Sequence, residues 1–219
     1  MKVEKLLDLP TTGFPNGLAA INDKTLLFTD SLKGNIGRVS LDANSTATYS
    51  VAIESPDLAI NETSTPLPVG ANGLKYRAPY IYWTQTWSGL VVRAPISPIT
   101  GQRTGNDEIL ATGQYIPDDI VVSSDGKMLY ITRPYAKTLV GVALPVDGGE
   151  AGEPKVLLGG QGSTIIPGAA AAIFGRGEDD KNVLYVSTSG GFTGDDGDGE
   201  ILEGGKVVAV HLGEANVCS

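Results

Sequence analysis

The sequence predicts an all-β protein of the β-propeller class with about four blades, and three observations favour this. One phrase recurs along the chain: a polar Asn or Asp, a short apolar run, a turn, and a β-rich run that ends in Thr. The openings of successive copies lie about 50 residues apart, a spacing typical of blade-sized β repeats. A further β-rich run follows each hairpin, and 29 Gly and 13 Pro supply turns. Because such sheets bury their faces against neighbouring sheets, the repeats predict blades.

Three copies of the phrase open on a polar residue and close on a threonine. The pairs are Asn16 with Thr29, Asn72 with Thr84, and Asp118 with Thr132. A fourth copy keeps the closing run, Val183 to Thr188, but opens on Ala169 to Ala172. The predicted blades span residues 14–51, 72–109, 117–158 and 162–212, and together they form one domain over 1–219.

The first ten residues read as one strand, Val3 to Leu9, without a hairpin partner before it. In a ring this strand would belong to a preceding blade that the chain does not contain. A six-bladed ring without its first two blades explains this strand better than a closed ring of four. We therefore expect an open ring, which a second copy of the chain could complete.

Composition excludes several classes of function. The net charge is −9, and the 16 basic residues are dispersed, so we expect no nucleic-acid partner. No apolar stretch is long enough to span a membrane. Cys218 is the single cysteine, which excludes a disulfide within the chain.

The compartment stays open. Met1 to Pro10 carries charged residues and no apolar core, so it does not read as a secretory signal. Asn44 and Asn61 begin glycosylation sequons, which leaves a secreted full-length form compatible with the sequence.

Familiar catalytic signatures are mostly missing from the sequence. His211 is the single histidine and lies in an apolar alternation, which is typical of an ordinary strand residue. Nucleophilic Ser/His pairs and multi-His metal sites are therefore excluded. No phosphate-binding loop or dinucleotide fingerprint occurs.

The repeat phase instead points to the polar openers. The innermost strand of a blade lines the central channel, so Asn16, Asn72 and Asp118 are expected to converge on one mouth of it. One carboxylate with amide oxygens suits Ca²⁺ or Mg²⁺ rather than Zn²⁺. The alternative is that these side chains cap turns through bonds to the backbone, as Asn and Asp routinely do.

Aromatic residues offer walls for an organic ligand. Trp83 falls in a strand, Trp87 in the following turn, and Tyr115 directly before the third opening. Flat apolar surface beside a few polar groups is typical of a pocket for a small organic molecule. Packing between blades is the alternative role for these rings.

Several motifs resemble the SMP-30/gluconolactonase-like six-bladed propellers, closest to a fungal branch. They are PNGL from Pro15, ANGL from Ala71, PDDI from Pro117, FGRGEDDKNVLYVSTSGG from Phe174 and GGKVVAV from Gly204. In metal-dependent lactonases of this superfamily, a Glu from the first blade, an Asn and an Asp hold a divalent cation. The resemblance carries the Asn onto Asn72 and the Asp onto Asp118, with Asn16 matching a substrate-side Asn. The Glu would lie before Met1 and has no counterpart here.

The fungal branch includes hetero-Diels-Alderases that join a tropolone quinone methide to a humulene-type terpene. The resemblance implies such an enzyme, with no cofactor and a small organic substrate. Asn72 and Asp118 would be its catalytic residues, and the substrate-binding residues would be Asn16, Trp83, Trp87, Tyr115 and Asp119. One alternative is a lactonase with Ca²⁺ or another divalent cation on Asn72 and Asp118. The other is a non-catalytic or vestigial propeller that binds small molecules.

Overall fold

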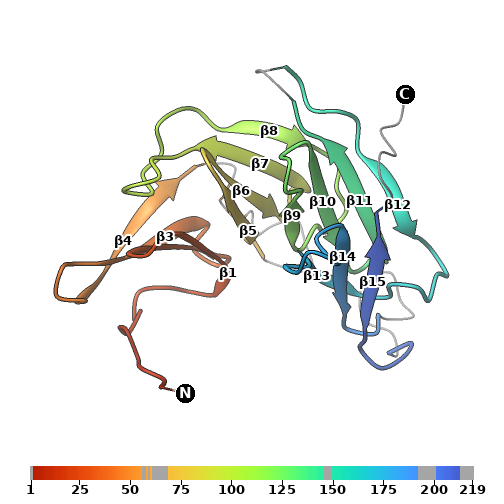
Figure 1. The fold of residues 1–219 in the computed structure, drawn as a ribbon, viewed down its shortest axis with the longest axis horizontal. Helices are drawn as coiled ribbons and strands as arrows, with labels where there is room; N and C mark the ends of the chain where they lie inside the picture. Colours follow the sequence, from red (N-terminus) through yellow and green to blue (C-terminus); the bar gives the residue numbers. More distant parts are fainter. Residues whose placement is uncertain are drawn as a thin grey trace. The chain divides into compact units, whose positions relative to one another are not determined.

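The protein was analysed as a computed structural model, which describes residues 2–55, 58, 60, 69–145, 149–191 and 201–212. These residues form four antiparallel sheets, so the expectation of an all-β protein with about four blades is confirmed (Figure 1). The chain divides into two compact units, residues 1–113 and 114–219, each described by itself below. The expectation of one domain over 1–219 stays a prediction. No helix in the described part of the chain is long and apolar enough to cross a membrane.

The first unit holds two four-stranded sheets in which neighbours in sequence are neighbours in space. The first sheet consists of β1 (Pro15–Asn22), β2 (Thr25–Asp30), β3 (Asn35–Leu41) and β4 (Ala47–Glu54). The second consists of β5 (Ala71–Arg77), β6 (Tyr80–Gln85), β7 (Leu90–Pro95) and β8 (Glu108–Ala111).

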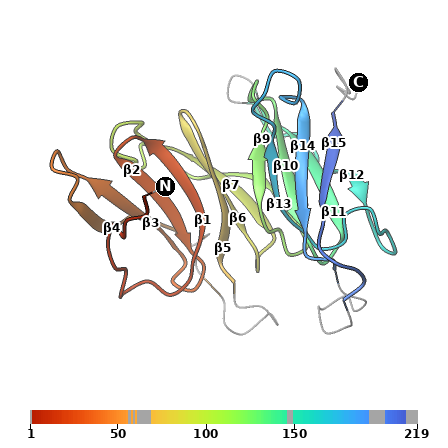
Figure 2. The same cartoon turned by 60° about the horizontal axis from the view of Figure 1, so that its bottom comes forward.

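The second unit holds a four-stranded and a three-stranded sheet. The former consists of β9 (Ile120–Val122), β10 (Met128–Arg133), β11 (Thr138–Ala143) and β12 (Lys155–Gly159). The latter consists of β13 (Ala169–Phe174), β14 (Val183–Thr188) and β15 (Val207–His211). Within this unit β13, the first strand of its sheet, packs beside β9 and β10 (Figure 2).

One predicted element is wrong. Residues 3–9 form no strand, and Val3 is largely exposed. A strand needs a hydrogen-bonded partner, and none of the described strands pairs with this segment. The first sheet also runs on to Glu54, three residues beyond the predicted end of its blade.

Each unit buries its own apolar core between its two sheets. In the first unit the core is built around Leu27, Ile36, Leu74, Ile81 and Trp83, all fully buried. In the second it includes Leu139, Ile166, Leu184 and Val186. All of these except Ile166 come from strands, and the burial of these strands explains the apolar runs within each repeat.

The closing threonine of the first repeat joins the two sheets of the first unit. Thr29 is fully buried, and its Oγ1 accepts a hydrogen bond from the Gly17 amide at 2.8 Å. The same hydroxyl donates to the carbonyl oxygen of Asn72 on β5 at 2.5 Å. The register between β1 and β2 shifts between Pro15 and Leu18, and this bulge turns the Gly17 amide toward the threonine.

Thr132 repeats this arrangement in the second unit. Its Oγ1 accepts from the Asp119 amide at 3.0 Å, and the hydroxyl lies 3.1 Å from the carbonyl oxygen of Ala170 on β13. Thr84 also accepts from an amide of its own innermost strand, that of Gly73, at 2.8 Å. The hydroxyl of the repeated threonine therefore links strands within a blade, and in Thr29 and Thr132 it also links neighbouring blades.

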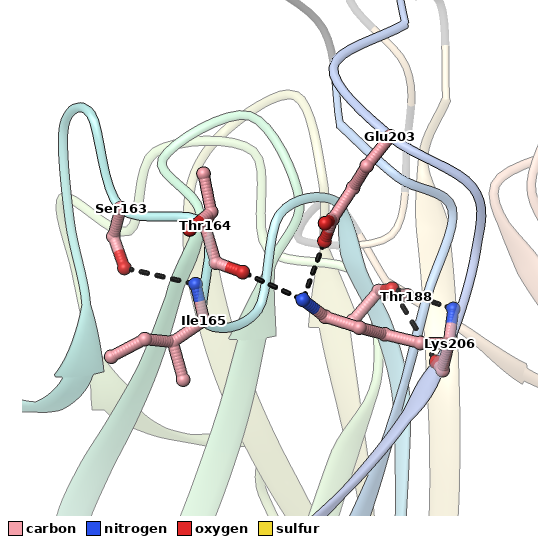
Figure 3. Close-up of polar contacts among 6 residues, drawn as sticks. All are labelled: Ser163, Thr164, Ile165, Thr188, Glu203 and Lys206. Atoms are coloured by element: carbon pink, nitrogen blue, oxygen red, sulfur yellow. Dashed lines mark hydrogen bonds and ion pairs between the residues drawn. The ribbon is translucent and has the colours of Figure 1, made fainter.

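Thr188 in the fourth repeat is the exception. Its Oγ1 accepts from the Lys206 amide at 3.1 Å, and Lys206 Nζ donates to the carbonyl oxygen of Thr164 at 2.7 Å (Figure 3). An ion pair of 2.5 Å with Glu203 completes the contacts of this lysine. In this repeat the threonine anchors the segment that leads into β15.

Replacing Thr29 with Val should lower the free energy of unfolding by about 2 to 4 kcal/mol, because the buried Gly17 amide and Asn72 carbonyl each lose a partner. Urea titration of the full chain measures this. Thr48→Val is the matched control, because its exposed hydroxyl makes only a 3.4 Å contact with Ser40. The control should change stability by less than about 0.5 kcal/mol. Equal losses in the two variants would contradict the role of Thr29.

Candidate functional site

Two of the predicted site residues, Asn16 and Asn72, lie close together at one end of the first unit. Asn16 on β1 donates from Nδ2 to Ser31 Oγ at 3.3 Å, and the Ser31 hydroxyl donates to the carbonyl oxygen of Ala71 at 2.6 Å. Asn72 follows Ala71 on β5, and its Nδ2 donates to Thr86 Oγ1 at 3.0 Å. A chain of polar contacts therefore runs from the first opening residue to the neighbour of the second.

Gly17 explains how the two strands come so close. A Cβ atom at this position would lie 2.5 Å from the Asn72 carbonyl oxygen and 2.6 Å from the Leu74 amide nitrogen. Only a residue without a side chain allows this approach of β1 to β5. In the Asn-Gly pair that opens the first repeat, Gly17 thus permits the close approach of β1 to β5, and Asn16 contributes the polar side chain next to it.

Both amide side chains are held by one of their two N–H groups. A primary amide has two N–H donors and a carbonyl oxygen, so the second donor and the oxygen stay available to a ligand. Asn16 is exposed, whereas Asn72 is only 7% exposed. The hydroxyls of Ser31 and Thr86 therefore fix the direction in which these amides present their remaining groups.

The two tryptophans differ in position. Trp83 is 0% exposed and belongs to the core of the first unit, so its expected contact with a substrate is wrong. It lies in the middle of β6, where the alternation turns its ring into the core. Trp87 is half-buried in the turn after β6, directly after Thr86, and its amide donates to the Val69 carbonyl at 3.2 Å. Trp87 therefore remains a candidate wall beside Asn72.

The other predicted site residues lie in the second unit. Tyr115 is 49% exposed. The Asp118 amide donates to the Thr132 carbonyl at 2.9 Å, while Asp119 Oδ2 accepts from the Ala172 amide on β13 at 3.3 Å. The Asp119 side chain thus links the sheets of this unit, which is the structural alternative to substrate binding.

Convergence of Asn16, Asn72 and Asp118 on one channel mouth stays a prediction, because Asp118 belongs to the other unit. The amide oxygen of Asn72 and the carboxylate of Asp118 suit a hard cation in chemical type. Within the described ranges no three His, Cys, Asp or Glu side chains lie together as they would in a metal site built from these residue types. His211 is an exposed residue of β15, as expected.

Of the two predicted glycosylation sequons, the structure describes the one at Asn44. Asn44 is exposed in the turn between β3 and β4, where its amide donates to Asp42 Oδ1 at 2.8 Å. Asn61 lies outside the described residues, as does Cys218.

The position directly after each closing threonine was missed by the sequence reasoning. Its occupants are Asp30, Gln85, Arg133 and Ser189. Asp30 Oδ2 accepts from the Gly13 amide at 2.7 Å, and its Oδ1 accepts from Phe14 at 2.9 Å and from Lys33 at 3.1 Å. Extending the comparison of the repeats by one residue would have found this position.

Asp30 is charged for a structural reason. Its burial raises the pKa, but hydrogen bonds from the amides of Phe14, Gly13, Lys33 and Leu32 outweigh this and hold the pKa below its ordinary value. The carboxylate therefore stabilises the start of the first blade in its ionised form.

Comparisons with known proteins support the fold. No protein-family model matches the chain, and no curated protein matches it significantly. Among solved structures, a luciferin-regenerating enzyme matches with a TM-score of 0.57 and 17% identity, over 89% of this chain and 60% of the other. A candidate 6-phosphogluconolactonase from Bacteroides fragilis matches with a TM-score of 0.53 and 12% identity, over 78% and 49%. One from Bacteroides uniformis matches with a TM-score of 0.52 and 14% identity, over 78% and 48%.

These likenesses show the fold alone. The protein has a β-propeller fold like that of luciferin-regenerating enzyme and of 6-phosphogluconolactonase-like proteins, at low identity. The chain spans roughly half to three-fifths of the length of these proteins.

Replacing Asp30 with Asn should remove part of the dependence of stability on pH. Because the folded pKa is lowered, the ionised group stabilises the fold above the unfolded value of about 4, and this contribution is lost as the pH falls through the folded pKa. The wild type should therefore exceed Asp30→Asn in stability at pH 7, and the gap should shrink below about pH 4. Urea titrations across pH measure this. Asp23→Asn, in an exposed hairpin turn, is the control, and a gap independent of pH would contradict the prediction.

Proposed function

We propose that the protein is an enzyme of fungal secondary metabolism resembling the hetero-Diels-Alderases. The reaction would join a tropolone quinone methide to a humulene-type terpene. The observation that carries the proposal is the pair of amides, Asn16 and Asn72, each held by a hydroxyl and each presenting a second N–H. Trp87 in the adjoining turn supplies half-buried aromatic surface.

A cycloaddition of this kind makes modest demands on a protein. Its new bonds form between the reactants, so the protein need only align the two molecules and stabilise charge on the carbonyl oxygen. An amide N–H of fixed direction is a suitable donor for that oxygen. A flat indole ring is a suitable surface for an apolar terpene.

The comparisons support this proposal only in its general part. Luciferin-regenerating enzyme is an enzyme with a propeller fold of this kind. The tropolone and terpene substrates come from the resemblance of the repeat motifs, including PNGL and ANGL, to the fungal branch.

Hydrolysis of a lactone is the second candidate function. The amide oxygen of Asn72 and the carboxylate of Asp118 have the chemistry that a hard divalent cation prefers. Two of the similar solved structures are described as candidate 6-phosphogluconolactonases. If the protein is a lactonase, calorimetry should detect Ca²⁺ binding, and the protein should hydrolyse gluconolactone. Asp118→Asn should lower both the Ca²⁺ affinity and the rate of hydrolysis.

Incubation of the full chain with a tropolone quinone-methide precursor and humulene tests the leading proposal. We expect an adduct that forms faster than the uncatalysed one and with a single stereochemistry. Asn16→Ala should lower this rate by roughly ten- to a hundredfold, because one donor to the carbonyl oxygen is lost. Chromatography with mass detection measures the rate.

Asn22→Ala is the matched control. Asn22 lies at the other end of β1, where its Nδ2 donates to carbonyl oxygens of Pro98 and Ile99. It should keep the wild-type rate. An adduct with the uncatalysed rate and stereochemistry would overturn the proposal, and ligand binding without turnover would favour a non-catalytic propeller.

A further inference from the structure

The turn between β10 and β11, residues 134–137, departs from the corresponding turns of the first unit. In those two turns the last residue is Gly34, with φ 64°, and Gly89, with φ 67°. The same position of the third repeat is occupied by Lys137, with φ 56°. This left-handed conformation is unfavourable for a residue with a side chain, so the fold itself favours glycine here.

Lys137 is also buried. It is 6% exposed, and its carbonyl oxygen accepts from the Gly160 amide at 3.0 Å. In the part of the chain that the structure describes, its ammonium group has no carboxylate partner. Its ammonium nitrogen is not buried without a partner, so the stem of the side chain is buried while the charged group reaches solvent. A lysine in a backbone conformation that favours glycine is unfavourable, and residues in strained conformations gather at functional sites.

Arg133, the last residue of β10, directly precedes this turn, and it also lacks a carboxylate partner among the described residues. Its Nε donates to Thr138 Oγ1 at 2.9 Å, and its Nη1 lies 3.5 Å from Gln114 Oε1. No described carboxylate pairs with it, and burial holds its pKa below the ordinary value. Arg93 shows the usual solution, because its Nε and Nη2 donate to the two carboxylate oxygens of Glu108 at 2.8 and 3.0 Å.

The other repeats show that this position does not require a cation. In the first repeat Asp30 caps backbone amides, a role that an arginine cannot take because it has no acceptor. Two cations without a carboxylate partner among the described residues therefore lie in one hairpin, β10–β11, of a protein whose net charge is −9. Together they offer positive charge to an anion from outside the described residues.

We propose that Arg133 and Lys137 form a binding site for an organic anion that carries two adjacent oxygen atoms. The hydrogen bond from Nε of Arg133 to Thr138 fixes the plane of the guanidinium. Two donors, one N–H of Nη2 and the outer N–H of Nη1, then remain for a ligand. These two parallel donors match a carboxylate or an ionised hydroxy-ketone such as tropolone. The choice of tropolone as a ligand rests on the proposed function, whereas the anion site does not.

Calorimetric titration of the full chain with tropolone and with benzoate, both ionised, tests the proposal. We expect both anions to bind, Arg133→Gln to weaken binding at least tenfold, and Arg133→Lys to restore only part, because lysine lacks the paired donors. Lys137→Gly should also weaken binding severalfold while keeping the unfolding midpoint near that of the wild type. Arg103→Gln is the control, since Arg103 forms an exposed ion pair with Asp107, and it should bind like the wild type.

Each other outcome decides against the proposal. It would be overturned by unchanged binding in Arg133→Gln, by no binding of either anion, or by inorganic phosphate binding as tightly as benzoate. A chain that binds tropolone through Arg133 but forms no cycloaddition product would overturn the proposed function alone. Equal adduct formation in Arg133→Gln and wild type, without tropolone binding, would overturn the anion site alone.

Discussion

The hydroxyl of the closing threonine is the interaction on which the rest of each unit depends. It accepts from a backbone amide, which in the first two repeats lies at a β-bulge, and in Thr29 and Thr132 it also contacts a carbonyl oxygen of the neighbouring sheet. Both backbone groups would otherwise be buried without partners, at a cost of about 1 to 3 kcal/mol each. In the first unit this contact brings the innermost strands β1 and β5 together, and Asn16 and Asn72 lie on those strands.

The recurring order of residue types in each repeat made the architecture predictable. Apolar runs, turn residues and a threonine at constant phase define the hairpins, because these depend on local sequence. The strand expected at Val3 to Leu9 failed for the opposite reason, since pairing depends on a partner that local sequence does not reveal. The fourth strands, such as β8 and β12, escaped the analysis because they are short or largely exposed and carry weak alternation.

The site was less predictable because one residue type serves two purposes. Asn72 opens the second repeat and Asp119 directly follows the opening residue of the third. The Asn72 side-chain amide binds a side chain, whereas the Asp119 carboxylate binds a backbone amide across the sheets. Trp83 and Trp87 are four residues apart, and only burial separates a core residue from a candidate ligand wall. Burial of a single ring depends on packing between sheets, which the sequence pattern does not specify.

In the turn after β10, the residues differ from those that the fold favours at the same positions of the first two repeats. Gly34 and Gly89 show that the turn geometry is satisfied by glycine, and Asp30 shows that the position after the threonine can stabilise the backbone. Arg133 and Lys137 provide neither service, although their side chains are partly or largely buried. Local choices that contradict the fold are expected where function has set them, since structural demands alone would remove them. By this reasoning the turn after β10 is the part of the second unit in which we propose that an anion binds.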